Sequence, residues 1–255
     1  MTGSDADLSV DEERRFGGLR RLHGAARYER LRAASVAVVG VGGVGSWAVE
    51  ALARSGVARL VLMDLDHVSE SNINRQLQAT SATLGMAKVQ ALRERIALIH
   101  PRCEVLTVED FVTADNWPGL LPCAVDGVID ACDQAAAKRA MATWALQPRS
   151  GVVHVCVGAA GGKHLAQKVA VDDLADCTHD PLLAGLRQRL RRDGVAPRKG
   201  RIGLRCVYSA EAVQGDVATT GDLSCHGYGS TVTVTATFGL VAAGECIEQI
   251  LKNSG

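Results

Sequence analysis

Four closely spaced glycines between two short apolar runs constrain this chain more than any other feature of its sequence. The apolar runs cover residues 36–39 and 60–63, and an amphipathic helical pattern separates the glycines from the second run. The glycines are Gly40, Gly42, Gly43 and Gly45. Asp64 follows the second run, about 20 residues past the glycines, where dinucleotide-binding folds place the acid that holds a ribose hydroxyl. The pattern predicts a strand, a phosphate-binding turn, a helix and a second strand.

The glycines have separate expected roles in this turn. Gly40 allows the tight turn, Gly42 lets the backbone approach a phosphate group, and Gly45 lets the helix pack on its strand. Gly43 removes a further side chain from the same turn. Backbone amides at the start of the following helix point toward an anion. We therefore expect the turn to bind phosphate groups.

The segment after the second strand carries charges that a redox cofactor does not need. It contains a second acid, Asp66, and an arginine, Arg75, and Lys88 begins the next predicted helix at 88–100. A nicotinamide ring occupies a dry apolar pocket, whereas polyphosphate oxygens accept the fork of donors on an arginine. The start of a helix favours the same anion. These residues favour a site for ATP over one for a nicotinamide dinucleotide.

Two acids follow a buried strand predicted at 127–129. Asp130 and Asp133 stand at the carboxyl end of this strand, which is the ligand edge of an open parallel sheet. One of the two is a candidate ligand for the Mg²⁺ that accompanies a nucleotide. Alternatively, Asp133 caps the amides of the helix predicted at 134–147. The residues leave both interpretations open.

The order of the remaining elements defines the expected fold class. Further strands are predicted at 104–108, 152–158, 168–171 and 206–209, and helices at 181–192 and 231–251. This alternation predicts an α/β fold with a Rossmann-like, doubly wound, mostly parallel sheet. A C-terminal extension is expected to add antiparallel strands and a final helix.

The expected domain organisation is simple. Residues 1–13 are interpreted as a disordered arm and residues 14–255 as one ATP-binding domain. Within this domain, 14–160 form the nucleotide-binding core and 161–255 an extension on the substrate and dimer side. The final helix carries threonines and glycines, so we expect a buried helix or a dimer-face helix and no membrane span.

Charge and cysteine content limit the partners. Lys and Arg together number 28, as do Asp and Glu, so nucleic-acid binding requires a local basic patch. The strongest concentration of basic residues lies between residues 187 and 205. Its tRNA-binding candidates are Arg191, Arg192, Arg198, Lys199 and Arg201. The alternative is a solvated helix face and loop, since no aromatic side chains are interleaved for base stacking.

The eight cysteines include no C-x-x-C pair, so no zinc site is expected. The polar, acidic start is not a secretory signal. Reduced thiols in a cytoplasmic protein are therefore expected, with peripheral association to a membrane left open.

Several segments in order and spacing resemble the ubiquitin-activating-enzyme-like superfamily. They are Arg15-Phe16, GVGGVG at 40–45, Asp64-Leu65-Asp66, SNINRQ at 71–76, Lys88 and Asp133. The resemblance implies ATP binding and a homodimer. It implies that Asp64 holds the ribose and that Asp133 holds Mg²⁺. The implied phosphate ligands are Asn72, Arg75 and Lys88, and Arg15 would reach the ATP of the partner subunit.

A closer resemblance, to the tRNA threonylcarbamoyladenosine dehydratase branch, covers most of the chain. It rests on RFGGLRRLHG, VVGVGGVGSWAVEALARSG, DFVTADN, DPLLAGLRQRL, CVYSAEA and VTATFG. This branch lacks the zinc-binding cysteine pairs of its relatives. The resemblance implies ATP-dependent activation of the threonyl carboxylate at position 37 of tRNA, followed by ring closure with loss of water. It also implies a cysteine desulfurase and its sulfur acceptor as partners.

Other functions remain as alternatives at this point. Adenylation of the C-terminal glycine of a ubiquitin-like sulfur carrier is disfavoured by the missing cysteine pairs. A sulfur-accepting thiol would be Cys225 or Cys206. A nicotinamide oxidoreductase is disfavoured by Arg75 and Lys88, and a non-catalytic nucleotide sensor by the intact set of charges.

Overall fold

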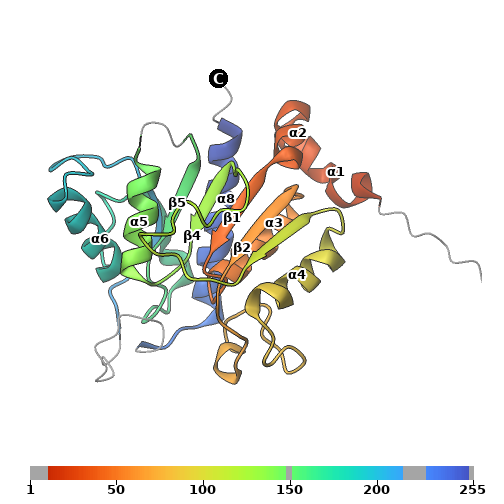
Figure 1. Cartoon of the computed structure of the whole chain (residues 1–255), viewed down its shortest axis with the longest axis horizontal. Coiled ribbons are helices and arrows are strands. Elements are labelled where there is room, and N and C mark those ends of the chain that lie inside the picture. The colour runs from red at the N-terminus through yellow and green to blue at the C-terminus, as the bar shows by residue number, and fades with distance from the viewer. Residues whose placement is uncertain (1–10, 148–150, 215–227, 253–255) are drawn as a thin grey trace, which may run out of the picture.

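A single seven-stranded sheet forms the centre of the computed structural model, which describes residues 11–147, 151–214 and 228–252 (Figure 1). The strand order is β3-β2-β1-β4-β5-β7-β6. All neighbouring strands are parallel except β6 and β7, which are antiparallel. The strands are β1 Ser35–Val39, β2 Arg59–Met63, β3 Glu104–Val108, β4 Gly127–Asp130, β5 Val153–Val157, β6 Val169–Asp173 and β7 Arg205–Ser209. The predicted α/β class, with a mostly parallel sheet and an antiparallel addition, is confirmed.

Helices cover both faces of the sheet. They are α1 Glu12–His23, α2 Ala25–Ala33, α3 Gly45–Arg54, α4 Lys88–Ile99, α5 Ala135–Ala145, α6 Pro181–Arg192 and α8 Val232–Lys252, with 3₁₀ turns η1 Glu70–Asn72 and η2 Ala166–Lys168. Successive residues of a strand point to opposite faces. Val36 and Val38 accordingly pack in the core with α3, α4 and α8, whereas Ala37 and Val39 pack in the core with α5. This two-sided burial explains why β1 and β2, in the middle of the sheet, are almost entirely apolar.

The chain reverses direction across the sheet between β1 and β4. From β1 it proceeds through β2 to β3 at one edge, and it then returns to form β4 on the other side of β1. Ligands of open α/β sheets bind at such a point, outside the carboxyl ends of the strands. The glycine turn that follows β1 and the acids that end β4 therefore meet there.

The first helix begins earlier than predicted. α1 starts at Glu12, with the Asp11 side chain accepting a hydrogen bond from the Arg14 amide at 2.9 Å. The helix thus begins two residues before the predicted domain start at residue 14, because the capping acid extends it toward the N-terminus. Gly24, at φ +79°, separates α1 from α2.

The final helix is a core element. By length and composition α8 is the one helix in the described ranges that would suit a membrane span. It instead packs along α3 and the sheet, with Phe238, Ala242 and Cys246 fully buried. Gly239 permits this close approach, because a Cβ there would lie 2.4 Å from the carbonyl oxygen of Val44.

A buried histidine makes the fold sensitive to acid. His154 on β5 is 8% exposed, and neither ring nitrogen has a hydrogen-bond partner among the residues that the structure describes. Burial lowers the pKa of His154 to about 4, opposed by the charge of Asp130 and assisted by that of Lys138. The unfolded chain therefore takes up this proton near pH 6.5 while the folded chain does not. Stability should fall as the pH drops from 6.5 toward 4, by about 3 kcal/mol for this group.

His154→Leu should flatten that part of the pH dependence in urea unfolding curves measured between pH 7 and 4.5. The matched control is His164→Leu, because His164 is exposed. Equal losses of stability on acidification in wild type and His154→Leu would contradict the assignment.

Candidate nucleotide-binding site

Residues from distant parts of the chain line one pocket at the carboxyl ends of β1, β2 and β4. The predicted site residues among them are Gly42, Gly43, Asp64, Asp66, Arg75, Lys88 and Asp133. The strand order explains the convergence, since the loops that follow these neighbouring strands leave the sheet at the same edge.

Two of the glycines are required by close backbone contacts in the turn. Gly45 begins α3, and a Cβ there would lie 1.8 Å from the carbonyl oxygen of Gly40. Gly40 has φ +79°, and a Cβ there would lie 3.0 Å from the backbone of Ala131 and Cys132. Gly42 differs, because its nearest neighbour would be a side-chain nitrogen of Gln76 at 3.7 Å. Gly42 thus leaves space on the pocket side of the turn.

Asp64 joins the glycine turn to the loop after β2. Its Oδ2 accepts a hydrogen bond from the Val41 amide at 2.8 Å, and its Oδ1 accepts one from the Asp66 amide at 3.0 Å. Burial raises the pKa of Asp64, and the charge of Lys88 opposes part of that rise. The Asp64 side chain therefore links the two loops that form this side of the pocket and also lines the pocket itself.

Two cationic side chains enter the pocket, and each is held by a neighbour. Lys88 Nζ lies 2.7 Å from Asp66 Oδ2, and the lysine side chain is 7% exposed. Arg75 Nη1 donates to Asn74 Oδ1 at 2.9 Å. The carbonyl oxygen of Arg75 accepts a hydrogen bond from Trp47 Nε1 at 3.1 Å. The backbone of Arg75 is therefore held independently of its guanidinium group.

Asn72 supports the loop and does not line the pocket. Its Oδ1 accepts a hydrogen bond from the Ser69 amide at 3.1 Å, which closes the capping box of η1. Its carbonyl oxygen accepts the amides of Arg75 and Gln76 at 3.1 and 2.9 Å. These hydrogen bonds place Asn72 in the turn that presents Arg75, and its direct contact with phosphate stays a prediction.

The two acids after β4 have different environments. Asp133 is exposed and lines the pocket. It does not cap the next helix, since Gln134 occupies the N-cap position without a side-chain hydrogen bond. Asp130 has no exposed surface and forms an ion pair with Lys138, at 2.8 Å. The prediction of Asp130 as a metal ligand is therefore wrong, because its carboxylate is enclosed beneath the pocket.

The donor set suits a nucleotide-bound Mg²⁺ better than a metal held by protein alone. The described ranges contain no group of three or more His, Cys, Asp or Glu side chains arranged to hold a metal ion. Mg²⁺ commonly binds one or two carboxylates together with substrate phosphates and water. The exposed carboxylate of Asp133, which lines the same pocket as the glycine turn, fits that pattern.

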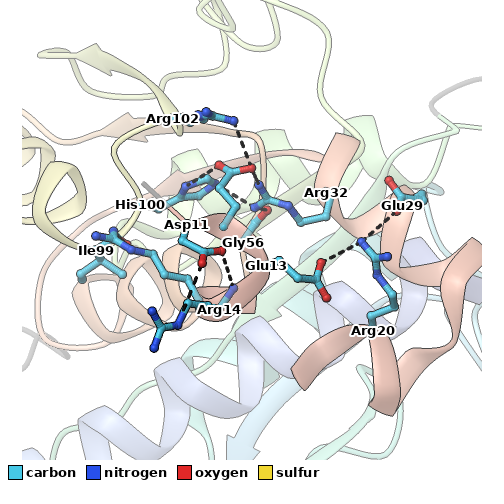
Figure 2. Close-up of polar contacts among 12 residues, drawn as sticks. Asp11, Glu13, Arg14, Arg20, Glu29, Arg32, Gly56, Ile99, His100 and Arg102 are labelled. Carbon is cyan, nitrogen blue, oxygen red and sulfur yellow. Dashed lines mark hydrogen bonds and ion pairs between the residues drawn. The ribbon is translucent and has the colours of Figure 1, made fainter. Parts of the chain in front are cut away.

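Arg15 lies outside the pocket of its own chain. It is exposed on α1, and its Nη1 donates to the carbonyl oxygen of Ile99 at 2.7 Å. α1 precedes α2, which ends just before β1, so both helices lie toward the amino end of that strand (Figure 1). Arg32, at the end of α2, donates to the carbonyl oxygen of Gly56, and its Nη1 lies 3.0 Å from a ring nitrogen of His100 (Figure 2). These contacts attach α2 to the rest of the domain.

Much of the basic segment is engaged within the chain. Arg191 Nη2 donates to the carbonyl oxygen of Gly200 at 3.0 Å, Arg192 contacts Asp193 at 3.4 Å, and Arg201 lies 3.9 Å from Asp173. Arg198 and Lys199 are exposed, and no partner is found for either side chain in the part of the chain that the structure describes. All five residues stay predicted tRNA contacts, because the side chains of Arg192 and Arg201 remain largely exposed and surface ion pairs are weak. Arg198 and Lys199 are the two free cations among them.

Cys206 is unsuited to accept sulfur in this fold. It is fully buried on β7, directly opposite Cys156 of β5. Contacts with Cys156 and Cys177, together with burial, raise the pKa of Cys206, so the reactive thiolate is disfavoured. This prediction is wrong for Cys206, and Cys225 lies outside the described residues.

Several pocket residues were not predicted from the sequence. They are Val44, Gln76, Ala131, Cys132, Gly158, Ala159, Ala160, Leu182 and Thr235. Gly158 is the last residue of the buried strand predicted at 152–158, so the rule that ligands bind at the carboxyl ends of parallel strands was a usable signal there. Leu182 and Thr235 come from α6 and α8, and no local pattern indicates that they reach the pocket.

A parallel sheet with a glycine turn, two cations and an exposed acid at its carboxyl edge defines a nucleotide-binding α/β protein of the Rossmann type. The chain belongs to the ThiF family, whose model matches residues 15–254.

Individual relatives are similar over nearly the whole chain. The tRNA threonylcarbamoyladenosine dehydratase of Escherichia coli is 40% identical over 94% of both chains. The dehydratase of Haemophilus influenzae is 37% identical over the same share of each. A crystal structure of the Escherichia coli enzyme in complex with ATP has a TM-score of 0.86 and 39% identity, covering 96% of this chain and 97% of that one. The predicted resemblance is confirmed.

Proposed function

We propose that this protein is an ATP-dependent tRNA threonylcarbamoyladenosine dehydratase, which converts N6-threonylcarbamoyladenosine at position 37 of tRNA to its cyclic form. The carrying observation is the pocket of Arg75, Lys88 and the glycine turn, in a chain 39% identical to a dehydratase solved with ATP. A carboxylate is a poor electrophile until one of its oxygens becomes part of a leaving group. ATP supplies that group, and the neighbouring carbamoyl nitrogen of the substrate then closes the ring.

The residues of the pocket account for the activation step. The glycine turn and the first amides of α3 bind phosphate oxygens. Arg75 and Lys88 stabilise the charge that develops during transfer, as preorganised cations do in phosphoryl and nucleotidyl transfer. Asp64 holds the ribose, and Asp133 holds Mg²⁺, which when bound neutralises phosphate charge. The attacking group belongs to the substrate, so this scheme needs no protein nucleophile.

The active form is proposed to be a homodimer in which Arg15 reaches the ATP of the partner subunit. The position of Arg15 supports this proposal, because it is exposed on α1 and does not line the pocket of its own chain. An arginine supplied in trans stabilises transferred phosphate charge in other nucleotide enzymes.

Cellular context follows from the same proposal. We place the protein in the cytoplasm, which suits the free thiols of the described cysteines. Transfer of sulfur from a cysteine desulfurase or its acceptor would depend on Cys225, since Cys206 is inaccessible.

Mass spectrometry of nucleosides tests the activity. tRNA bearing threonylcarbamoyladenosine, incubated with the protein, ATP and Mg²⁺, should yield a nucleoside lighter by one water. Omission of ATP provides the control. Turnover of ATP that requires a small protein ending in Gly-Gly, with no change in tRNA, would instead support adenylation of a sulfur carrier.

The two free cations of the basic segment should contribute to tRNA affinity. Arg198→Ala combined with Lys199→Ala should lower the slope of log K against log salt by about 1 to 2, because each phosphate contact releases counterions. The matched control removes Arg21 and Arg93, which are exposed on α1 and α4. A slope that changes only in the control pair would move the tRNA contact to another surface.

A further inference from the structure

A fully buried ion pair lies directly beneath the nucleotide pocket. Lys138 Nζ on α5 contacts Asp130 Oδ1 at 2.8 Å and the carbonyl oxygen of Asp130 at 3.3 Å, and neither side chain is exposed. Burial alone would lower the pKa of Lys138, but the charge of Asp130 and its hydrogen bond, together with Cys156 and Cys132, outweigh burial, so the pKa is raised. Apolar residues of similar volume often replace such a pair without loss of stability. Its presence here therefore points to a role besides stability.

The Asp130 carboxylate also holds the turn that follows β4. Its Oδ1 accepts the amide of Cys132 at 3.3 Å and the thiol of Cys132 at 3.0 Å. The amide of Ala131 donates to the carbonyl oxygen of Val39 at 2.9 Å, which ties the same turn to β1. Residues 131–133 consequently have little freedom to move relative to the sheet.

This turn forms part of the pocket and supports the glycine turn. Ala131, Cys132 and Asp133 all line the pocket. The backbone of Ala131 and Cys132 lies against Gly40, where a Cβ would come within 3.0 Å. In the described part of the chain no hydrogen-bond or ion-pair partner is found for the Asp133 carboxylate, so its direction depends on the backbone of the turn.

We propose that Asp130 and Lys138 form a positioning pair that fixes residues 131–133 and thereby presents the Asp133 carboxylate to metal-bound triphosphate. This role rests on the proposed function through the assignment of Asp133. Neither residue of the pair lines the pocket, and both side chains are fully buried. They act through the backbone at Cys132, as partners behind a metal ligand orient that ligand in other sites.

The test separates positioning from stability by means of two double variants. Asp130→Leu with Lys138→Met removes both charges and the acceptor for the Cys132 amide. Asp130→Asn with Lys138→Met removes both charges but keeps an acceptor oxygen. Isothermal titration with ATP, in MgCl₂ and separately in EDTA, gives the affinity, and thermal unfolding gives the stability of the full-length chain.

We expect the apolar double variant to unfold near the wild-type temperature. Its affinity for ATP in MgCl₂ should fall by roughly tenfold or more, as for other partners behind metal ligands, with affinity in EDTA nearly unchanged. The asparagine variant should recover most of the loss. Asp133→Asn should show the same loss, and adding the apolar pair to it should cost little more, since residues acting through one another are not additive.

Three results would overturn the proposal. One is wild-type Mg²⁺ dependence in the apolar variant. Another is an equal loss of ATP affinity in EDTA, which would mean that the pair supports the whole pocket and not Asp133 in particular. The third is a full additional loss on top of Asp133→Asn. Should the apolar variant unfold, the asparagine variant still decides, because positioning requires it to retain Mg²⁺-dependent affinity. If wild type binds Mg²⁺ and ATP but leaves tRNA unchanged, the proposed function fails while this inference stands.

Discussion

Arg75→Ala should abolish cyclisation of threonylcarbamoyladenosine, with a loss of about a thousandfold or more, as for arginines that stabilise phosphate charge. The fold should persist, because Trp47 and Thr235 contact the carbonyl oxygen of Arg75 rather than its guanidinium group. Nucleoside mass spectrometry over a time course measures the rate, and thermal unfolding checks the fold. Arg54→Ala is the control, since Arg54 is exposed on α3 and pairs with Glu50. Full activity in Arg75→Ala would remove Arg75 from the phosphate site.

The same variant tests whether Arg15 acts in the site of its own chain or in that of the partner subunit. Homodimers of Arg15→Ala and of Arg75→Ala should each be inactive. In a purified heterodimer of the two chains, one site would combine an intact Arg75 with an intact Arg15 from the partner. Activity should therefore return to about half the wild-type level if the finger acts in trans. A heterodimer as inactive as its parents would contradict a role of Arg15 in trans, whereas an active Arg15→Ala homodimer would place Arg15 outside the mechanism.

Gly45→Ala should have the largest effect on stability. The new Cβ would lie 1.8 Å from the carbonyl oxygen of Gly40, and neither atom belongs to a flexible side chain. Either the glycine turn or the start of α3 must move, so we expect a loss of about 3 kcal/mol or more in the free energy of unfolding. Urea unfolding measures this loss, and ATP titration of the remaining folded protein should show weakened binding.

Gly42→Ala is the matched control for this prediction. Its Cβ would meet only Gln76 Nε2 at an ordinary contact distance of 3.7 Å. Stability should change by less than about 1 kcal/mol, whereas ATP affinity should fall because the methyl group occupies the pocket side of the turn. Similar stabilities for Gly45→Ala and Gly42→Ala would contradict the close contact between Gly45 and Gly40.

Taken together, these variants distinguish residues that shape the pocket from residues that face its ligand. Gly40, Gly45 and the Asp130–Lys138 pair belong to the first group, because their contacts are internal. Arg75 belongs to the second, since it lines the pocket. Loss of a shaping residue should affect stability or the geometry of binding, whereas loss of a facing residue should affect binding and rate with the fold intact.

The sequence alone determined the order of strands and helices, the phosphate-binding turn and the pocket positions of Arg75, Lys88 and Asp133. These features depend on local periodicity and on the rule that parallel strands open at their carboxyl ends, so residues near one another in sequence suffice to predict them. Strand β3 and helix α6 lie at their predicted bounds for that reason. The buried apolar strands and the glycine spacing are signals of the same kind.

Only the tertiary structure decided which polar residues face inward. Asp130 and Asp133 are close in sequence, yet their side chains have different surroundings. Asp130 pairs with Lys138 of α5, whereas Asp133 lines the pocket. Cys206 is buried because β7 inserts beside β5, a pairing that no local pattern encodes. Thr235 reaches the pocket because α8 crosses the sheet near the glycine turn. Burial and charge pairing depend on neighbours supplied by distant segments, so these assignments required the assembled fold.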